Sequence, residues 1–564
     1  MSLPFDMKED SIYMVPLGGC GFFGANMTLY GYNGQWIMVD CGMGFADDTM
    51  PGVDVLLPDP TFAAELGDDL LAIVLTHGHE DHIGAIPHLW PRLRKPLYAT
   101  KFTAGRIRKA IDDATWGPEA RIHEVPPQGK LDFGPFHIEY IPMAHSIPEA
   151  NALAISVKRV GTILHTGDWK LDPDPVEGGV TDEKALKTLG ETGVLALVGD
   201  STNAMVPGHS GSERAVQKNL ADLFGEFKDK IAITCFATNV ARLSSIDAAA
   251  KANGRKVCLV GRSLWKIDEV ARQSGYLKDT RPFIEEDEAN MLDAGKIVYI
   301  CTGSQGEPRA ALAKIAAEDH PRVRLRADDV IIFSSRAIPG NQRAIDRIKN
   351  RFYGAGINVI TDREAPIHVS GHPYREELKQ LYAWTKPKIA IPVHGERMQL
   401  EKHAALAREA GANLGYDLQT IMPANGQVLE IASEGIASYV GEVQAGILAV
   451  EGGRVVAVDH EAILVRKRMM FNGSAVVTVV IDAHGKLAAP PKVTALGLLD
   501  ENSELDAQYI ADAVKEIKKA VENAPKELRA DDDALSEMVR VTARRFFNAR
   551  FDRKPQTRVH LVRI

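Results

Sequence analysis

The sequence predicts an α/β protein in which a parallel-sheet domain is inserted into a strand-rich domain. A small α+β domain follows them at the C-terminal end of the chain. Two observations support this class. Residues 11–205 alternate short strands with glycine-rich turns, whereas residues 212–335 alternate strands with helical segments, the order that predicts a parallel sheet. After residue 365 the first texture resumes, and an inserted domain explains that order most simply.

The chain length also requires several domains, because 564 residues exceed what one hydrophobic core can organise. We predict that the strand-rich domain comprises residues 1–205 and 365–445. The inserted domain is predicted to comprise residues 206–364. Residues 446–460 are predicted to be a linker, and residues 461–564 the C-terminal α+β domain.

The composition is that of an ordinary globular protein, with 45% hydrophobic and 25% charged residues. No apolar run reaches the roughly 18 residues that a membrane-spanning helix needs, and the first residues lack a secretory pattern, so we expect no membrane association. The five cysteines are widely spaced and form no C-x-x-C pair, which favours reduced thiols in a cytoplasmic protein. The net charge of −9 gives no indication of nucleic-acid binding.

In the strand-rich domain, short apolar runs with many branched residues predict the strands. They lie at residues 11–19, 34–42, 71–76, 136–142, 152–158, 162–168 and 194–200. Helical periodicity is sparse in this part, and the best candidates follow His82 and cover residues 101–113. Pro87 is expected to confine the first of these to a short or kinked helix.

The inserted domain shows helical periodicity in four segments, at residues 212–227, 239–253, 263–275 and 307–318. The strands between them are predicted at residues 230–236, 256–261, 296–302 and 330–335. Beyond residue 365 we expect a helix near residues 374–384 and a strand at 388–394. The C-terminal α+β domain is indicated by the stretches "AILVRKR" and "SAVVTVVIDA", by helices predicted at about 503–523 and 531–548, and by a final strand.

Metal-ligating residue types are concentrated where the strand at residues 71–76 ends, in "HGHEDH", residues 77–82. Three imidazoles and two carboxylates lie within six positions, and imidazole nitrogen and carboxylate oxygen are the ligands that Zn²⁺ and similar ions take. A tight turn can direct His77 and His79 to one side, and Asp81 and His82 to the other. The motif therefore predicts two neighbouring ions.

Further ligands are expected at other strand ends that face the same edge. His145, Asp168 and His394 each follow a branched apolar run. Asp168 is suited to bridge two ions, since one carboxylate can give an oxygen to each. His165 lies inside its strand and is interpreted as a hydrogen-bonded neighbour of the site.

Several motifs together resemble a known family. They are "HGHEDHIGAIP", "HSIPEANALAI", "HTGDWKLD", "GDSTNA", "SSRAIPGN", "HVSGH" and "PVHGE". The order of the histidines and Asp168 along the chain resembles that of proteins with the metallo-β-lactamase fold, an αββα sandwich. The inserted domain resembles that of the β-CASP nucleases. Across about residues 10–450 the chain is similar to the ribonuclease J family. One departure is the glycine loop "GGCGFFGANM", where that family more often has charged residues at the positions of Phe22 and Ala25.

The resemblance implies roles for the motif residues. Two Zn²⁺ ions are expected, with Mn²⁺ or Mg²⁺ as alternatives, since two such ions can activate water and polarise a phosphoryl oxygen. One ion would be held by His77, His79 and His145, and the other by Asp81, His82 and His394, with Asp168 between them. Asp81 and Asp168 would thereby serve catalysis.

The motif "HVSGH" carries two further implied roles. On the residues alone it is a polar turn; by the resemblance His372 is a general acid oriented by Asp200. The family would hold a terminal 5′-phosphate with this loop and with the "FATN" turn, which on the residues alone is a helix N-cap. The residues concerned are His368, Val369, Ser370, Gly371 and His372 in the loop, and Phe236, Ala237, Thr238 and Asn239 in the turn.

The function implied is RNA processing and decay by a ribonuclease that degrades 5′-monophosphorylated RNA from 5′ to 3′, with internal cleavage compatible with the same site. A DNA nuclease, a small-molecule thioester or lactone hydrolase and an RNA-binding scaffold with an inactive site are the alternatives. Basic stretches at residues 91–109 and 544–564, with seven Lys and Arg each, are candidates for RNA contacts. The family commonly forms homodimers or homotetramers.

Overall fold

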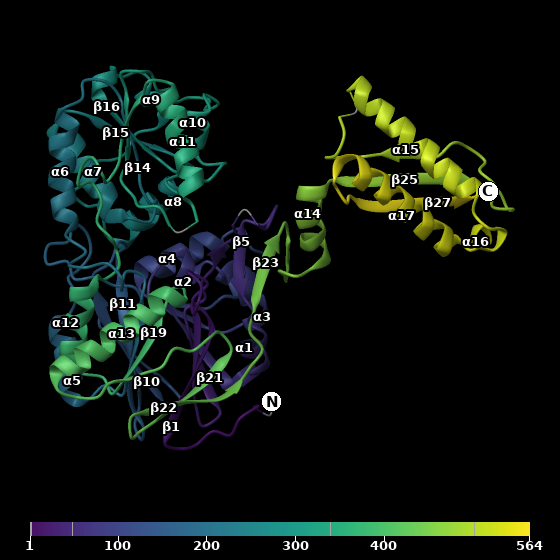
Figure 1. The fold of residues 1–564 in the computed structure, drawn as a ribbon. Coiled ribbons are helices and arrows are strands. Elements are labelled where there is room, and N and C mark those ends of the chain that lie inside the picture. The colour runs from purple at the N-terminus through teal and green to yellow at the C-terminus, as the bar shows by residue number, and fades with distance from the viewer. Residues whose placement is uncertain (1–2, 48, 339, 501) are drawn as a thin grey trace. The chain divides into compact units, whose positions relative to one another are not determined.

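The structure is a computed structural model that describes residues 3–47, 49–338, 340–500 and 502–564. The chain divides into two compact units (Figure 1). The first takes in the residues up to Phe45 together with Leu56–Ile447, and the second takes in Ala46–Val55 and Leu448–Ile564. Within the described residues, no helix combines the length and apolar character needed to cross a membrane. All five cysteines are buried free thiols.

Two sheets form the strand-rich part of the first unit. The first has eight strands in the order β22 (Ile436–Glu442), β21 (Gln427–Ala432), β1 (Ser11–Gly18), β2 (Met27–Tyr32), β3 (Gln35–Val39), β6 (Leu70–Val74), β7 (Leu97–Ala99) and β8 (Ile122–Glu124). The second has seven in the order β20 (Gln419–Thr420), β19 (Ile389–Val393), β13 (Ala196–Asp200), β12 (Gly161–His165), β11 (Ala150–Val157), β10 (Phe136–Met143) and β9 (Lys130–Phe133).

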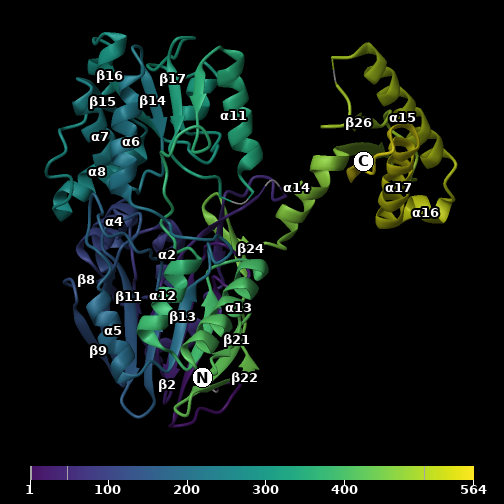
Figure 2. The same ribbon diagram turned by 60° about the vertical axis from the view of Figure 1, so that its left-hand side comes forward.

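The two sheets pack face to face, and helices cover the outer sides, so the four layers form an αββα sandwich as predicted (Figures 1 and 2). Side chains of both sheets share one core, for example Ile37 of β3 and Ile155 of β11. On the far side of the second sheet, the helices α5 (Glu183–Thr192), α12 (Arg375–Thr385) and α13 (Arg397–Leu414) bury leucines against it. On the far side of the first sheet, Phe62 of α1 (Thr61–Glu65) packs edge-on against Trp36.

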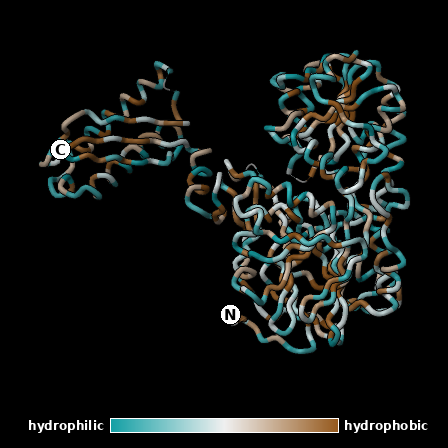
Figure 3. Tube along the Cα trace, turned by 180° about the vertical axis from the view of Figure 1, so that it is seen from behind, coloured by the Kyte–Doolittle hydropathy of each residue, from teal (hydrophilic) through white to brown (hydrophobic). Residues whose placement is uncertain are grey.

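The inserted part is a five-stranded parallel sheet, which confirms the strand–helix alternation seen in the sequence. The order is β15 (Lys256–Val260), β16 (Ile297–Cys301), β14 (Ile231–Thr234), β17 (Val330–Phe333) and β18 (Asn358–Ile360). The helices α6 (Glu213–Gly225), α7 (Val240–Ala252) and α8 (Arg262–Ser274) cover one face, and α10 (Ala311–Ala316) and α11 (Gln342–Gly354) the other. The sheet is the apolar centre of this part in Figure 3.

The insertion leaves and re-enters the sandwich at one place. The chain departs at the end of β13, and after the inserted part it returns through α12 and then β19, which pairs in parallel with β13. In that register Asp200 lies opposite Val393, the residue before His394. Residues that are almost 200 positions apart in the sequence thereby come to the same sheet edge.

The metal-ligand motif ends in a short helix, but Pro87 is not what interrupts it. The helix α2 (Glu80–Ile83) ends before Gly84, and α3 (Ile86–Leu93) begins with Pro87 in its first turn. A proline is favourable there, because the amide hydrogen that it lacks would have no helical partner. The next predicted helix, residues 101–113, is α4 (Lys101–Ile111).

The second unit has a three-stranded sheet in the order β26 (Lys492–Thr494), β25 (Ser474–Ile481) and β27 (Gln556–Arg563). The helices α15 (Glu504–Glu522) and α17 (Asp532–Phe551) pack on it around a core that includes Val477, Ile517 and Phe547. The stretch predicted as a linker is an antiparallel hairpin of β23 (Ile447–Glu451) and β24 (Arg454–Ala457). The helix α14 (Glu461–Asn472) follows it, held by an ion pair from Arg466 to Glu451.

Candidate metal centre

The predicted metal ligands follow strands of the sandwich, most of them in turns, with Asp81 and His82 in the short helix α2. β6 is followed by His77, His79, Asp81 and His82, β10 by His145, β12 by Asp168, and β19 by His394. The strands β12, β13 and β19 are parallel neighbours, so their carboxyl ends meet at one edge. This placement follows from the topology, and it explains why ligands scattered over the sequence converge.

The first group of potential ligands consists of His77, His79, His145 and Asp168, whose ligand atoms lie within 4.8 Å of one another. The Nδ1 atom of His79 lies 3.2 Å from Nε2 of His77 and 3.0 Å from Nε2 of His145. Zn–N bonds of about 2.0–2.1 Å place neighbouring nitrogens at roughly this separation around one ion. The structure thus brings together the residues predicted for the first ion.

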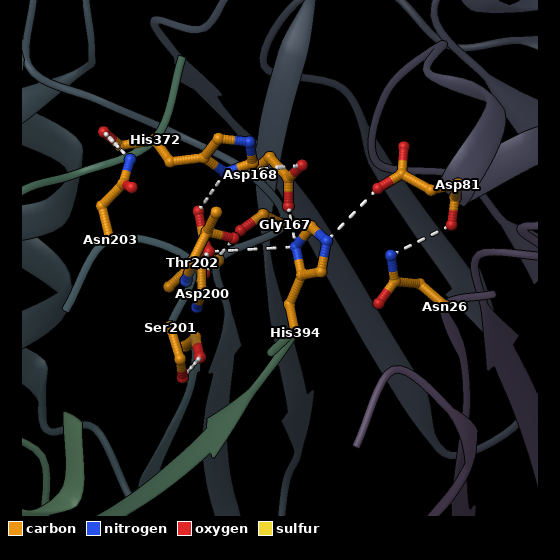
Figure 4. A network of polar contacts seen from close by, with 12 residues as sticks. Asn26, Asp81, Gly167, Asp168, Asp200, Ser201, Thr202, Asn203, His372 and His394 are labelled. Atoms are coloured by element: carbon orange, nitrogen blue, oxygen red, sulfur yellow. Dashed lines mark hydrogen bonds and ion pairs between the residues drawn. The ribbon is translucent and has the colours of Figure 1, made fainter. Parts of the chain in front are cut away.

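The second group consists of Asp81, His82, Asp168 and His394, also within 4.8 Å of one another. The Nε2 atom of His394 lies 3.2 Å from Oδ2 of Asp81, and the Nε2 atom of His82 lies 3.3 Å from Oδ2 of Asp168. Figure 4 shows Asp81 and His394 pointing toward each other from opposite sides of the site. This is the set predicted for the second ion.

Asp168 belongs to both groups, and its environment tests whether a cation fits. The residue is 1% exposed, and its Oδ1 atom lies 2.7 Å from Nδ1 of His394. Its Oδ2 atom is buried without a hydrogen-bond partner, 3.7 Å from Nε2 of His77. A buried carboxylate oxygen without a partner is costly unless a cation satisfies it. The residues therefore fit a divalent cation on either side of Asp168.

The protonation states of the histidines also suit metal binding. Burial lowers the pKa of His77 and of His145 well below its usual range, which keeps both imidazoles in the neutral form that coordinates a metal. For His82 and His394 burial alone would lower the pKa, but the carboxylates around them raise it well above its usual range. These two imidazoles lie where negative charge attracts a cation, whether a proton or a metal ion.

The sequence analysis missed Asp40, the residue that orients His82. Asp40 follows β3, is 1% exposed, and its Oδ2 atom lies 2.7 Å from Nδ1 of His82. The same carboxylate accepts hydrogen bonds from the amide and the hydroxyl of Thr76, which fix it in place. His82 therefore presents its other nitrogen, Nε2, to the site.

Asp40→Ala should weaken metal binding by about 10–100-fold, because carboxylates that hold a ligating imidazole contribute about this much. The measurement is the apparent metal dissociation constant, obtained by competition with a chelator. Asp132→Ala is the matched control, since Asp132 holds Nδ1 of His137 at the same 2.7 Å on the protein surface. Equal affinities for wild type and Asp40→Ala would refute the orienting role.

His372 and Asp200 form the predicted imidazole–carboxylate pair. The Nδ1 atom of His372 lies 2.8 Å from Oδ2 of the buried Asp200 (Figure 4). The amide of Thr202 donates to the other oxygen of Asp200, which holds the carboxylate in place. Burial alone would lower the pKa of His372, but Asp200 and then Asp168 outweigh it and raise that pKa.

A third cluster of potential ligands overlaps with this pair, because Asp168, Asp200, His372 and His394 also lie within 4.8 Å of one another. The Nδ1 atom of His372 is 1.0 Å farther from Oδ2 of Asp168 than from Oδ2 of Asp200, at 3.8 Å against 2.8 Å. The nearer partner of His372 is therefore a carboxylate that belongs to neither of the two predicted ligand sets.

The loop 368–372 and the "FATN" turn are brought near each other by Arg242, in the first turn of α7. Arg242 donates to the carbonyl oxygen of Ile367, just before the loop, at 3.3 Å. Its own amide is capped by Oδ1 of Asn239 at 2.9 Å, so the turn does begin a helix. In the loop, Nδ1 of His368 is buried without a partner, and the hydroxyl of Ser370 accepts a hydrogen bond from Asn203.

The remaining loop residues have mixed environments. Val369 packs against the hydrophobic core of the inserted domain. The carbonyl oxygen of Gly371 lies 2.5 Å from Nδ1 of His145. In the "FATN" turn, Asn239 is buried, whereas Phe236, Ala237 and Thr238 are half-buried. His165, interpreted as a neighbour of the site, has Nδ1 at 2.8 Å from the hydroxyl of Tyr30.

The atypical glycine loop lies directly beside the second ligand group. Ala25 has a left-handed backbone with φ of 53°, and the next residue, Asn26, donates through its amide and its side chain to the carbonyl oxygen of Asp81. The side-chain nitrogen of Asn26 also lies 3.1 Å from Nε2 of His82. Phe22 packs against Gly44, where a Cβ atom would come within 2.5 Å of its ring. Asn26 had no signal in the sequence beyond this loop.

The basic stretch 91–109 is largely occupied by intramolecular contacts. Ion pairs within 4.0 Å engage five of its seven cations, which are Arg94, Lys95, Arg106, Arg108 and Lys109. In the stretch 544–564, Arg563 pairs with Asp532, and Arg550 lies over the ring of Phe546. RNA contacts by these stretches stay a prediction.

Comparison with known families covers most of the chain. Residues 20–209 match the metallo-beta-lactamase superfamily, and residues 228–352 match the ribonuclease J beta-CASP domain. Residues 356–419 match the Zn-dependent metallo-hydrolase RNA specificity domain, and residues 462–564 match the ribonuclease J C-terminal domain. A solved structure of a protein of unknown function from Enterococcus faecalis covers 74% of this chain with a TM-score of 0.52 and 17% identity, which supports the fold.

The fold and the histidine–aspartate site define a metallo-β-lactamase-superfamily protein with a β-CASP insertion. Ribonuclease J of Sinorhizobium meliloti is 42% identical over 99% of both chains. Ribonuclease J of Corynebacterium glutamicum is 37% identical over 98% of this chain and 76% of its own length, and that of Thermus thermophilus is 34% identical over 84% and 83%. The chain belongs to the ribonuclease J family.

Proposed function

We propose that the protein is a metal-dependent ribonuclease that degrades RNA from 5′ to 3′ and prefers a 5′-monophosphate. The observation that carries the proposal is the pair of ligand groups that share Asp168, in a chain that belongs to the ribonuclease J family. When bound, two divalent ions would activate water and polarise the scissile phosphate. The first group would hold one ion and the second group the other.

Side chains of the protein would supply the proton for the leaving group and orient the imidazoles of the site. The leaving sugar oxygen needs a proton, and His372 would donate one, because Asp200 holds its ring through Nδ1 and leaves Nε2 for the substrate. Asp40 and the carbonyl oxygen of Gly371 orient His82 and His145 through their Nδ1 atoms. Each of these three imidazoles thus has one nitrogen held by the protein and would direct the other to the reaction.

Preference for a terminal monophosphate is supported by the surroundings of His368. Its buried Nδ1 atom has no hydrogen-bond partner. After burial, the positive charges of Arg242, Arg336 and Lys170 lower the pKa of this imidazole well below its usual range. Each of these three cations is also paired with a carboxylate, so the observation that supports an anion here is the buried imidazole nitrogen without a partner. The loop 368–372 would place that anion next to the general acid His372.

A 5′-triphosphate should slow decay relative to a monophosphate by at least about tenfold, because two more phosphates must be accommodated at the same loop. The measurement is the release of labelled mononucleotide from one RNA with either 5′ end, with products sized on a gel. A single-stranded DNA of the same sequence tests the DNA-nuclease alternative. Equal rates on both RNA ends, with internal fragments as the only products, would identify an endonuclease and overturn the proposal.

A further inference from the structure

The helix α4 contacts the back of the metal-ligand turn through one side chain, Arg106. The guanidinium group donates through Nη1 to the carbonyl oxygen of Gly78, between His77 and His79. Through Nη2 it pairs with Oε1 of Glu80 at 2.5 Å. Both terminal nitrogens of Arg106 therefore bond to the turn, and its side chain is only 11% exposed.

The contact is close because Gly78 has no side chain. A Cβ atom at Gly78 would lie 3.3 Å from Cδ of Arg106 and 3.4 Å from the hydroxyl of Thr103, which is also on α4. The stem of Arg106 therefore lies directly against the peptide that separates two ligands of the first group. A glycine between two ligands leaves this peptide free to rotate unless something outside the turn fixes it.

The helix that carries Arg106 is itself fixed at both ends. At its start, Oε2 of Glu149 accepts the amide hydrogen of Phe102 at 2.8 Å. Near its end, Lys109 pairs with Glu269 of α8 in the inserted part at 2.7 Å. Between them, Gly105 lies so close to α8 that a Cβ atom would come within 3.0 Å of Val270. Arg106 thus lies on a helix that has contacts at both of its ends and with α8.

We propose that Arg106 is a positioning residue that holds the turn 78–80, so that His77 and His79 are preorganised for the first ion. The inference rests on the proposed metal-dependent function. The Nε2 atom of His77 and the Nδ1 atom of His79 lie 3.2 Å apart, and a fixed peptide between the two residues would keep this spacing ready for an ion. The ion pair with Glu80 adds a second point of attachment on the far side of His79. Arg106 comes from the basic stretch 91–109, but its nitrogens face the turn, not a solvent surface that RNA could reach.

The test compares Arg106→Met and Arg106→Lys with Arg108→Met. Arg108 lies on the same helix and also pairs with a glutamate at 2.6 Å, but at the exposed surface next to β8. The measurements are zinc retained after dialysis, the zinc dissociation constant by chelator competition, and kcat and KM on RNA at saturating zinc. Thermal unfolding with saturating zinc reports on folding.

Arg106→Met should bind zinc about 10–100-fold more weakly, as loss of an outer support usually does, with KM for RNA unchanged and kcat restored by excess zinc. Arg106→Lys should recover part of the zinc affinity, because one donor can still reach the carbonyl oxygen of Gly78. Arg108→Met should retain zinc like the wild type. If Arg106→Met retains zinc but raises KM in a salt-dependent way, Arg106 is an RNA contact and the inference is wrong.

A fall in thermal stability at saturating zinc, with no recovery of kcat, would make Arg106 a residue of general stability and would also overturn the inference. The proposed function fails separately. It fails if the wild type itself retains no zinc and cleaves RNA after chelation, whatever the variants do.

Discussion

Replacing Asp168 by alanine will remove both metal ions and abolish RNA cleavage. Asp168 is the one residue shared by the two ligand groups, and its buried Oδ2 atom has no hydrogen-bond partner in the protein. Its loss takes a ligand from each ion and removes the largest of the negative charges that raise the pKa of His82 and of His394. Elemental analysis of the purified protein should give close to two equivalents for the wild type and close to zero for the variant.

Asp81→Ala tests a ligand that belongs to one ligand group, in contrast to Asp168, which belongs to both. Asp81 belongs to the second group alone, so its loss should leave about one equivalent of metal while still abolishing cleavage. Circular dichroism should show that both variants keep the fold, because these side chains are held within the site and not in the apolar core. If Asp168→Ala keeps both ions, or if the wild type stays active after chelation, the two-metal proposal is wrong.

Much of this site could be predicted from sequence, because each main ligand follows an apolar strand and the side chain after a strand lies at a sheet edge. Asp40 satisfies the same rule, since it ends "GQWIMVD" and follows β3. It was missed because a single aspartate after a strand is usually only solvated. Its partner, His82, lies 42 positions away, and their pairing depends on β3 and β6 being neighbours.

Other features had no local signal. Arg106 lies in a run of basic residues, and nothing in that run distinguishes it from Arg108; the difference is a backbone carbonyl at Gly78, which has no sequence signature. The helix α13 was not predicted because its buried face mixes leucines with small and polar residues, such as Ala404 and His403, which gives a weak amphipathic pattern. Local patterns predict strand ends and strong periodicity, whereas contacts between distant turns need the folded topology.

His372→Ala and His394→Ala should differ in metal content although both are histidines at the same edge. The Nε2 atom of His394 lies 3.2 Å from Asp81, within the second ligand group, so its loss should lower the metal content as well as the activity. The nearest partner of His372 is Asp200 at 2.8 Å, outside the two predicted ligand sets. His372→Ala should therefore keep both ions and still bind RNA.

The loss of cleavage in His372→Ala should be about 10²–10⁴-fold, the usual contribution of a positioned proton donor. Asp200→Asn should lose less, because the imidazole remains and only its orientation and pKa suffer. The control that separates an acid from a ligand is bis(4-nitrophenyl) phosphate, whose leaving group departs without a proton. On this substrate His372→Ala should recover most of its lost rate, whereas His394→Ala should recover none.

The third cluster of potential ligands makes this comparison decisive, because His372 lies near enough to Asp168 to coordinate an ion if Asp200 turned away. A ligand role predicts that His372→Ala loses metal, and that extra metal restores its activity on RNA. An acid role predicts full metal content, no effect of extra metal, and recovery only on the activated substrate. Loss of metal from His372→Ala, or failure of the activated substrate to recover its rate, would show that His372 is not the proton donor.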